Sequence, residues 1–312
     1  MELYQPRCMA ATGDAVGEGA VWCAQEQALY WTDINRFLIH RHDESTASTI
    51  TWLFDEPVVA LSLTSQPGRW LVALASRLIW WWPKGDVRRD HGFVLDGFPA
   101  VRLNDGRADA HGNFWIGSMR NNVAADGEPG EAGGRDGKLF RIRPDGAASV
   151  HLDGIGIANT ICWSPAGATF YTADTLDNMI WAFDFDDGNM PLSNRRPFFG
   201  GWERGLPDGS VIDAEGYLWN CRFFGKCIVR IAPDGRIDRV VEMPVTNITT
   251  ATFGGHDLRT LFVTSAGAGR QAGERLAGSL WALRCEVPGL PEQRVHVLEP
   301  TDFNPHQQGN HR

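Results

Sequence analysis

The sequence predicts an all-β protein, a six-bladed β-propeller, on three observations. A block of strand, tight turn and second strand recurs along the chain. Trp and Gly are abundant, with 13 and 35 residues among 312. No long stretch keeps the helical period of 3.6 residues. Abundant Trp and Gly suit many short strands that each pack an aromatic side chain and end in a glycine turn.

The clearest copy of the repeat lies between Gly209 and Trp219. An apolar strand leads to a turn at Asp213–Gly216, and a second strand opens on Leu218 and Trp219. This order is typical of a β-hairpin. The same plan is found at 19–31, 106–115 and 161–171, and more weakly at 61–71 and 253–262.

The spacing of the copies predicts the number of blades. A further strand usually follows each hairpin, as in 137–146 and 227–235. Repeats of roughly 40–50 residues with about four strands are propeller blades, and six of them fit the length. A large β-sandwich is the alternative, but it has no reason to repeat glycine, turn and aromatic residue in register. The second strands are expected to begin near residues 29, 71, 114, 170, 218 and 261.

The longest interval between copies contains a polar, glycine-rich run at 120–136. Loops of this length are usually functional lids or disordered segments. We therefore expect one propeller domain spanning 1–312 with a lid loop at 120–136.

Polar residues recur at one register of the innermost strands. These strands line the channel of a propeller, so residues at one register converge on its axis. Three side chains lie eight residues before the turn glycine of their blocks, and a glutamate begins the equivalent stretch of the first blade. They are Asn104, with Asp105 beside it, Asn159, Asp208 and Glu18.

Oxygen ligands of this kind suit a hard divalent cation such as Ca²⁺, Mg²⁺ or Mn²⁺. Carboxylates gathered at one mouth would repel each other without a cation. Each Asp-Gly or Asn-Asp-Gly could instead be a simple turn, but recurrence at one register favours a site. Arg102 precedes Asn104 by two residues and so faces the same side of its strand. It would hold an anionic or hydroxylated ligand, or form a salt bridge with an acidic neighbour.

Composition and motifs exclude several classes of function. The net charge is −9 without Lys or Arg stripes, which argues against nucleic-acid binding. No apolar run approaches the ~20 residues of a membrane span, and no signal peptide is recognisable. The six cysteines form no CxxC pair, so we expect reduced thiols in a cytoplasmic protein. No nucleophile elbow, nucleotide-binding loop or HExxH motif occurs.

Motifs along residues 14 to 285 resemble those of a known family. Residues 17–22, Gly-Glu-Gly-Ala-Val-Trp, are similar to its opening Gly-Glu-Gly-Pro-x-Trp. Residues 102–106, Arg-Leu-Asn-Asp-Gly, resemble its Arg-x-Asn-Asp-Gly segment, and 163–165 and 207–219 match further. The family is that of senescence marker protein-30, gluconolactonase and the luciferin-regenerating enzyme, which are six-bladed propellers.

The resemblance implies a metal-dependent sugar lactonase, which hydrolyses aldonolactones to aldonic acids in sugar catabolism. Glu18, Asn159 and Asp208 would ligate one divalent metal, whose identity stays open among Ca, Zn, Mn, Mg and Fe. Arg102 and Asn104 would bind the sugar. Asp208 would be the catalytic base, although it would then also be a metal ligand. The expected partner is a small sugar lactone, with no nucleic acid or membrane, and the expected assembly is a monomer or small homo-oligomer.

Three departures from the family pattern concern the site. Thr160 follows Asn159 where the family often has Gly, so the turn is expected to differ slightly. Ala20 stands where Pro is usual. Asn122 lies near the place where some members use a Glu to contact sugar, and we expect Asn122 to bind substrate instead, which leaves the sugar open.

Two other functions remain as alternatives. The first is a propeller hydrolase acting on other lactones or organophosphates, but such enzymes commonly have two calcium ions and a catalytic His near the channel, and no such His is evident. The second is a non-enzymatic, metal-binding regulatory propeller.

Overall fold

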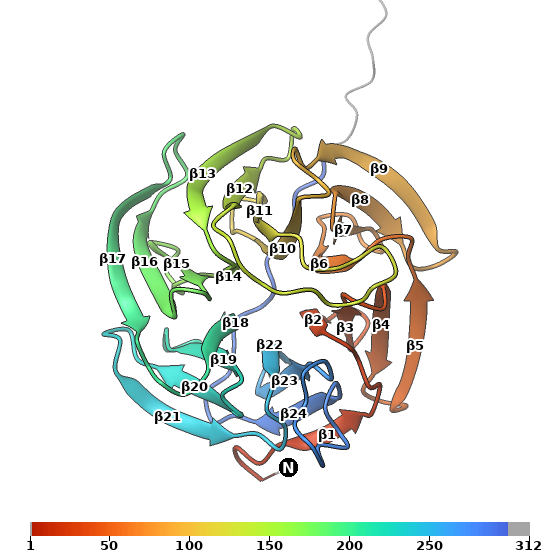
Figure 1. The fold of residues 1–312 in the computed structure, drawn as a ribbon, viewed down its shortest axis with the longest axis vertical. Coiled ribbons are helices and arrows are strands. Elements are labelled where there is room, and N and C mark those ends of the chain that lie inside the picture. Colours follow the sequence, from red (N-terminus) through yellow and green to blue (C-terminus); the bar gives the residue numbers. More distant parts are fainter. Residues whose placement is uncertain (1, 299–312) are drawn as a thin grey trace, which may run out of the picture.

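The computed structural model describes residues 2–298 and consists of six four-stranded antiparallel sheets arranged around a central channel (Figure 1). This confirms the predicted six-bladed propeller. The first three blades are β2 (Gly17–Cys23), β3 (Ala28–Asp33), β4 (Leu38–Asp43) and β5 (Ser48–Leu53); β6 (Val58–Leu63), β7 (Trp70–Leu74), β8 (Arg77–Trp82) and β9 (Val87–Val94); and β10 (Val101–Ala108), β11 (Phe114–Arg120), β12 (Gly137–Ile142) and β13 (Ala148–Ile155). The last three are β14 (Ala158–Trp163), β15 (Thr169–Asp174), β16 (Met179–Phe185) and β17 (Leu192–Gly200); β18 (Leu206–Ile212), β19 (Leu218–Phe223), β20 (Cys227–Ile231) and β21 (Ile237–Glu242); and β22 (Ile248–Gly254), β23 (Thr260–Ser265), β24 (Leu280–Arg284) and β1 (Arg7–Ala10).

The ring is closed by the N-terminal strand. β1 pairs antiparallel with β24, with Cys8 opposite Trp281, so the sixth blade contains both ends of the repeat (Figure 1). Pairing the edge of β24 in this way removes an exposed strand edge. The second strands of the blades begin within one residue of the predicted positions, at Ala28, Trp70, Phe114, Thr169, Leu218 and Thr260.

Buried carboxylates fix several inner hairpins. Asp213 accepts the indole N–H of Trp219 through Oδ2 at 2.9 Å, and its Oδ1 accepts the backbone N–H groups of Glu215 and Tyr217. Each hydrogen bond to a charged group contributes about 1.5–3 kcal/mol. The turn is thereby fixed against the second strand of its own hairpin. An equivalent indole–carboxylate bond of 2.8 Å joins Trp115 to Asp109. In the first blade, Trp31 donates at 2.8 Å to Asp14, which precedes β2.

Each innermost strand has a register shift against its neighbour. In β2 the shift lies between Glu18 and Val21, and in β14 between Asn159 and Cys162. A bulge bends its strand and changes the direction of the side chains beside it. The polar residues found by sequence register therefore lie at bulges, with comparable shifts in β10 and β18.

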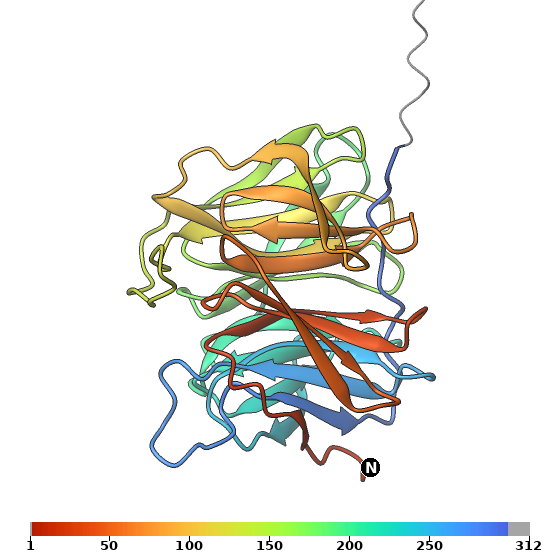
Figure 2. The same cartoon turned by 90° about the vertical axis from the view of Figure 1, so that its right-hand side faces the viewer.

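The channel has two different ends. We call the end where the innermost strands of the four polar blades begin the site mouth, and the opposite end the far mouth. Residues 286–298 cross the far mouth (Figures 1 and 2). Their backbone binds the inner strand of the second blade, where the Val295 N–H donates to the Leu63 carbonyl at 2.9 Å. Within residues 2–298, no helix is long and apolar enough to cross a membrane.

Candidate active site

The site mouth opens into a cavity of about 840 Å³. The side chains predicted to ligate the metal or bind the substrate all line this cavity, although they come from four blades, whereas Asp105 does not line it. They are Glu18 on β2, Arg102 and Asn104 on β10, Asn159 on β14, Asp208 on β18, and Asn122 just after β11.

A chain of amides and hydroxyls orients Asn159. The Nδ2 of Asn104 donates to Asn159 Oδ1 at 2.9 Å, and Asn159 Nδ2 donates to Thr175 Oγ1 at 2.9 Å. The Thr175 hydroxyl in turn donates to the Pro207 carbonyl at 2.7 Å. The amide oxygen of Asn159 thus uses one lone pair within the protein and keeps the other for a ligand. This series of hydrogen bonds links the third, fourth and fifth blades and ends at Pro207, the residue before Asp208.

Arg102 is buried and bound to amides. Its Nη1 donates to Asn104 Oδ1 at 2.7 Å, while Nε and Nη2 both donate to Asn122 Oδ1 at 3.1 and 2.9 Å. Burial lowers its pKa to about 10, against the opposing effect of Glu18 and Asp208. The sequence left two roles open for Arg102, ligand binding and a salt bridge. Within residues 2–298, Arg102 forms no salt bridge. The guanidinium instead ties Asn122 to the strand that carries Asn104.

Glu18 and Asp208 are acidic groups in an environment that disfavours their charge. Burial raises the pKa of Glu18 well above its usual value, and the negative charges of Asp208 and Asp105 raise it further. Burial and the charge of Asp105 act likewise on the pKa of Asp208. Among the described residues, neither carboxylate has a Lys, Arg or His nitrogen within 4.0 Å. A bound cation would offset this repulsion.

The donor set fits a hard divalent cation. Two carboxylates and the amide oxygen of Asn159 approach from three blades, and oxygen ligands of this type hold Ca²⁺, Mg²⁺ or Mn²⁺. No group of three His, Cys, Asp or Glu side chains suited to a metal occurs in the described part of the chain. Any cation here would therefore depend on the neutral amide as its third protein ligand.

Two aspartates that were not among the predicted site residues hold the segments that lead into the metal-ligand candidates. The Asp33 carboxylate accepts the N–H groups of Ala15 and Val16 at 2.9 and 3.1 Å, just before Glu18. In the fourth blade, Asp174 accepts the N–H groups of Gly156 and Ile157 at 2.9 and 3.3 Å, just before Asn159.

In the fifth blade, Arg222 holds the segment that leads into Asp208. It donates to the carbonyls of Arg204 and Gly205 at 3.1 and 2.5 Å, just before Asp208. Burial lowers its pKa to about 10. A sequence signal existed, because Asp33, Asp174 and Arg222 each lie three residues after an aromatic residue of the second strand.

Thr160 adopts the backbone conformation of the glycine that it replaces. Its φ is +56°, in the left-handed region that β-branched residues rarely enter. The hydroxyl donates to the Asp208 carbonyl at 2.6 Å and lies 2.8 Å from Ser210 Oγ. Thr160 therefore adopts a conformation that normally favours glycine, and its hydroxyl bridges the strands of Asn159 and Asp208.

The loop between β11 and β12 extends over the site mouth (Figure 1). Asn35 Nδ2 donates to the Gly127 carbonyl at 2.7 Å, which fixes the loop to the first blade. On the other side, Arg135 pairs with Asp177 and lies 3.5 Å from Asp174 of the fourth blade. Besides Asn122, the part of the loop that lines the cavity is Pro129, Gly130, Glu131 and Ala132.

Apolar side chains form much of the remaining wall. Phe224 is 58% exposed and Leu176 is 39% exposed, although both line the cavity. Exposed apolar surface inside a cavity usually contacts a ligand. Their apolar neighbours in the wall are Val16, Ile34, Met119, Ile157, Leu206 and Phe223.

Comparison with known proteins establishes the family. The model of the SMP-30/Gluconolactonase/LRE-like region matches residues 16–267, and the chain belongs to this family. It is 32% identical to a 6-deoxy-6-sulfogluconolactonase of Pseudomonas putida, over 92% of this chain and 97% of that protein. It is also 32% identical to a pentonolactonase of Haloferax volcanii, over 92% and 96% of the two chains.

A solved structure agrees with the fold. A regucalcin from Agrobacterium tumefaciens, described as a calcium-binding protein, superposes with a TM-score of 0.86 and 26% identity. The match covers 93% of this chain and 97% of that structure.

Proposed function

We propose that this protein is a lactonase that hydrolyses the ring ester of a sugar lactone with the help of one divalent metal ion. The protein is an enzyme of the lactonase class in sugar metabolism, as its similarity to two named sugar lactonases over more than nine tenths of the chain indicates. The metal dependence and the roles of individual residues are our proposal. The observation that carries them is the convergence of Glu18, Asn159 and Asp208 in one cavity.

The proposed metal ligands are Glu18, Asn159 and Asp208. The mutual repulsion of the two carboxylates and the fixed amide of Asn159 support this assignment. The calcium-binding description of the superposed regucalcin supports it as well. A divalent ion bound here would supply Lewis-acid polarisation of the ester carbonyl and lower the pKa of a water.

The protein's own groups would bind and orient the substrate. Arg102 and Asn104 lie in the cavity wall and would hold sugar oxygens, with Asn122 held in place by the two hydrogen bonds from Arg102. Asp208 would accept a proton from the attacking water.

The loop 120–136 would act as a lid. It reaches both the first and the fourth blade and places Glu131 in the cavity wall. Excluding water around the lactone would strengthen the interactions of the charged groups with the reacting ester. The sugar itself stays open, since the cavity wall combines amides with apolar side chains.

The test is hydrolysis of a panel of pentono- and hexonolactones by metal-loaded protein, compared with spontaneous ring opening. We expect at least one lactone to be hydrolysed and chelation to abolish its turnover. Asp208→Ala should lose activity by at least a thousandfold while keeping its circular dichroism spectrum. Asp145→Ala is the matched control, because Asp145 is an exposed turn carboxylate outside the cavity.

The outcomes separate the parts of the proposal. If no lactone of the panel is hydrolysed, the sugar-lactonase function is wrong. If the chelated protein keeps full activity, the metal dependence is wrong while the lactonase class stands. If Asp208→Ala retains activity, its role as base and ligand is wrong.

A further inference from the structure

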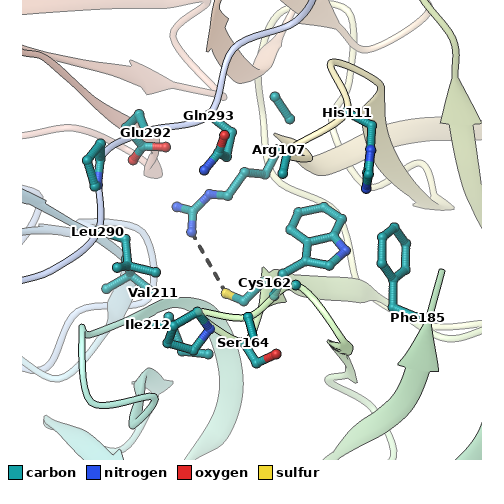
Figure 3. A pocket seen from close by; sticks show the side chains of 17 residues that line it. Arg107, His111, Cys162, Ser164, Phe185, Val211, Ile212, Leu290, Glu292 and Gln293 are labelled. Atoms are coloured by element: carbon teal, nitrogen blue, oxygen red, sulfur yellow. Dashed lines mark hydrogen bonds between the residues drawn. The ribbon is translucent and has the colours of Figure 1, made fainter. Parts of the chain in front are cut away.

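A second cavity of about 330 Å³ lies at the far mouth (Figure 3). The innermost strands β10, β14 and β18 form one side of it, and residues 290–293 of the C-terminal segment form the other. None of its lining residues lines the cavity at the site mouth. The two cavities are therefore separate.

The strands β10, β14 and β18 line both cavities, and the residues that line the far cavity lie after the bulge of each strand. Arg107, Cys162 and Val211 each follow a polar residue of the site mouth by three positions on their strands. The register shifts between these positions separate the two sets of side chains. The far cavity is thus a regular product of the blade repeat, closed by residues outside it.

One end of the far cavity is polar and carries opposite charges. Arg107 Nη1 donates to the Ser210 carbonyl at 3.1 Å and to Cys162 Sγ at 3.8 Å. Within residues 2–298, its Nε and Nη2 have no hydrogen-bond acceptor. Two donor groups of this guanidinium, which points into the cavity, are therefore available to a ligand (Figure 3).

Glu292 supplies an acceptor and a compensating charge. Its Oε1 accepts the Thr252 hydroxyl at 2.6 Å, and Oε2 has no donor among the described residues. Burial lowers the pKa of Arg107, but the negative charge of Glu292 is the largest of the opposing effects, and the pKa rises overall. The two groups lie more than 4.0 Å apart, so they act on each other without forming an ion pair.

The other end of the far cavity is apolar and partly aromatic. Trp163 and Phe185 pack edge to face with ring centroids 5.8 Å apart. Leu290 of the C-terminal segment lines the side of the cavity opposite Phe185, next to Val211 and Glu292 (Figure 3). The volume falls at the lower end of the range for small-molecule sites. A flat, ring-sized ligand fits such walls better than a hydroxylated sugar.

We propose that the far cavity is a second binding site, for a small neutral ring compound that carries an amide. The amide carbonyl would accept hydrogen bonds from the free donors of Arg107, and its N–H would donate to Glu292. The ring would lie against Trp163 at the aromatic end of the cavity. A carboxylate ligand would be repelled by Glu292 and an ammonium ligand by Arg107, so the paired charges select a neutral molecule.

The test is isothermal titration calorimetry with benzamide, carried out on Asp208→Ala protein in the presence of chelator. This background makes the result independent of the proposed lactonase activity. We expect saturable binding with a dissociation constant on the order of 1 mM. Sodium benzoate, which has the same shape with a negative charge, should bind at least tenfold more weakly.

Two added substitutions locate the ligand. Arg107→Gln should weaken benzamide binding at least tenfold, and Leu290→Trp, which fills the cavity from the C-terminal segment, should abolish it. Arg143→Gln, at an exposed arginine outside the cavity, is the control and should leave binding unchanged. Glu292→Gln should reduce the difference between benzoate and benzamide.

The proposal is overturned by any of three results. Benzamide does not bind, or it binds Leu290→Trp as well as the parent protein, or benzoate binds as tightly as benzamide. Leu290→Trp keeps the test decisive if Arg107→Gln fails to fold, because Leu290 lies outside the strands.

Discussion

Thr160 combines a strained backbone with two buried hydrogen bonds, and substitution can separate the two effects. A left-handed conformation costs an L-residue about 1–2 kcal/mol relative to its normal range. The hydroxyl offsets this cost through Asp208 and Ser210, whose oxygens keep a second donor in Asn220 Nδ2 at 3.3 and 2.9 Å. Losing the hydroxyl therefore removes two hydrogen bonds. Both oxygens keep the donor of Asn220, while the Ser210 O–H loses Thr160 Oγ1 as its acceptor.

The magnitudes follow for two variants. Thr160→Val keeps the shape and the strain but loses two bonds of about 0.5–1.5 kcal/mol each, so unfolding should become easier by about 1–3 kcal/mol. Thr160→Gly loses the same bonds and relieves the strain, while its freer unfolded chain costs about 0.4–1 kcal/mol. The glycine variant should consequently be more stable than the valine variant by about 1 kcal/mol.

Urea denaturation followed by tryptophan fluorescence measures these differences, with Thr160→Ser as the control that keeps the hydroxyl. A valine variant as stable as the parent would show that the hydroxyl contributes nothing. A glycine variant less stable than the valine variant would refute the strain at φ +56°.

Three further predictions concern other parts of the site and fold. In chelated protein, the raised pKa values of Glu18 and Asp208 give stability that is present at low pH and is lost as pH rises. Asp208→Asn should therefore raise the melting temperature more at pH 8 than at pH 5. An equal rise at both pH values would contradict this prediction. Arg135→Ala should raise KM with little change in melting temperature, because it removes an anchor of the loop. Arg143→Ala, the control, should change neither quantity. A KM of Arg135→Ala equal to that of the parent protein would exclude a substrate-related role for the loop. Asp213→Ala should lower the free energy of unfolding by about 3 kcal/mol in urea, since it removes a buried partner of an arginine; a loss under 1 kcal/mol would refute this.

The repeat was predictable from sequence because its determinants are local. A turn glycine, an aliphatic–aromatic pair and a period of two specify a hairpin without reference to the rest of the chain. The second strands accordingly begin within one residue of expectation. Counting back from the turn glycines also grouped Asn159 and Asp208 with Glu18, and the structure brings these side chains to one cavity, where their roles remain predictions.

The supporting contacts of the site could not be predicted in the same way, because their partners come from other segments. The position of Arg222, three residues after Trp219, is a local signal, but it does not indicate which carbonyls Arg222 binds. No local pattern indicates that the lid loop reaches Asn35 across the site mouth. The composition of the loop marked it as irregular, but its anchors depend on which blades stand on either side of it.

The sequence by itself determined the blade, its repeat number and the register that carries the polar residues, since strands and turns follow from neighbouring residues. Only the tertiary structure decided that Thr160 keeps a glycine backbone, since its hydroxyl finds a partner on the next blade. The far cavity was likewise decided by folding. Arg107 and Leu290 line one cavity because residues 286–298 cross the far mouth.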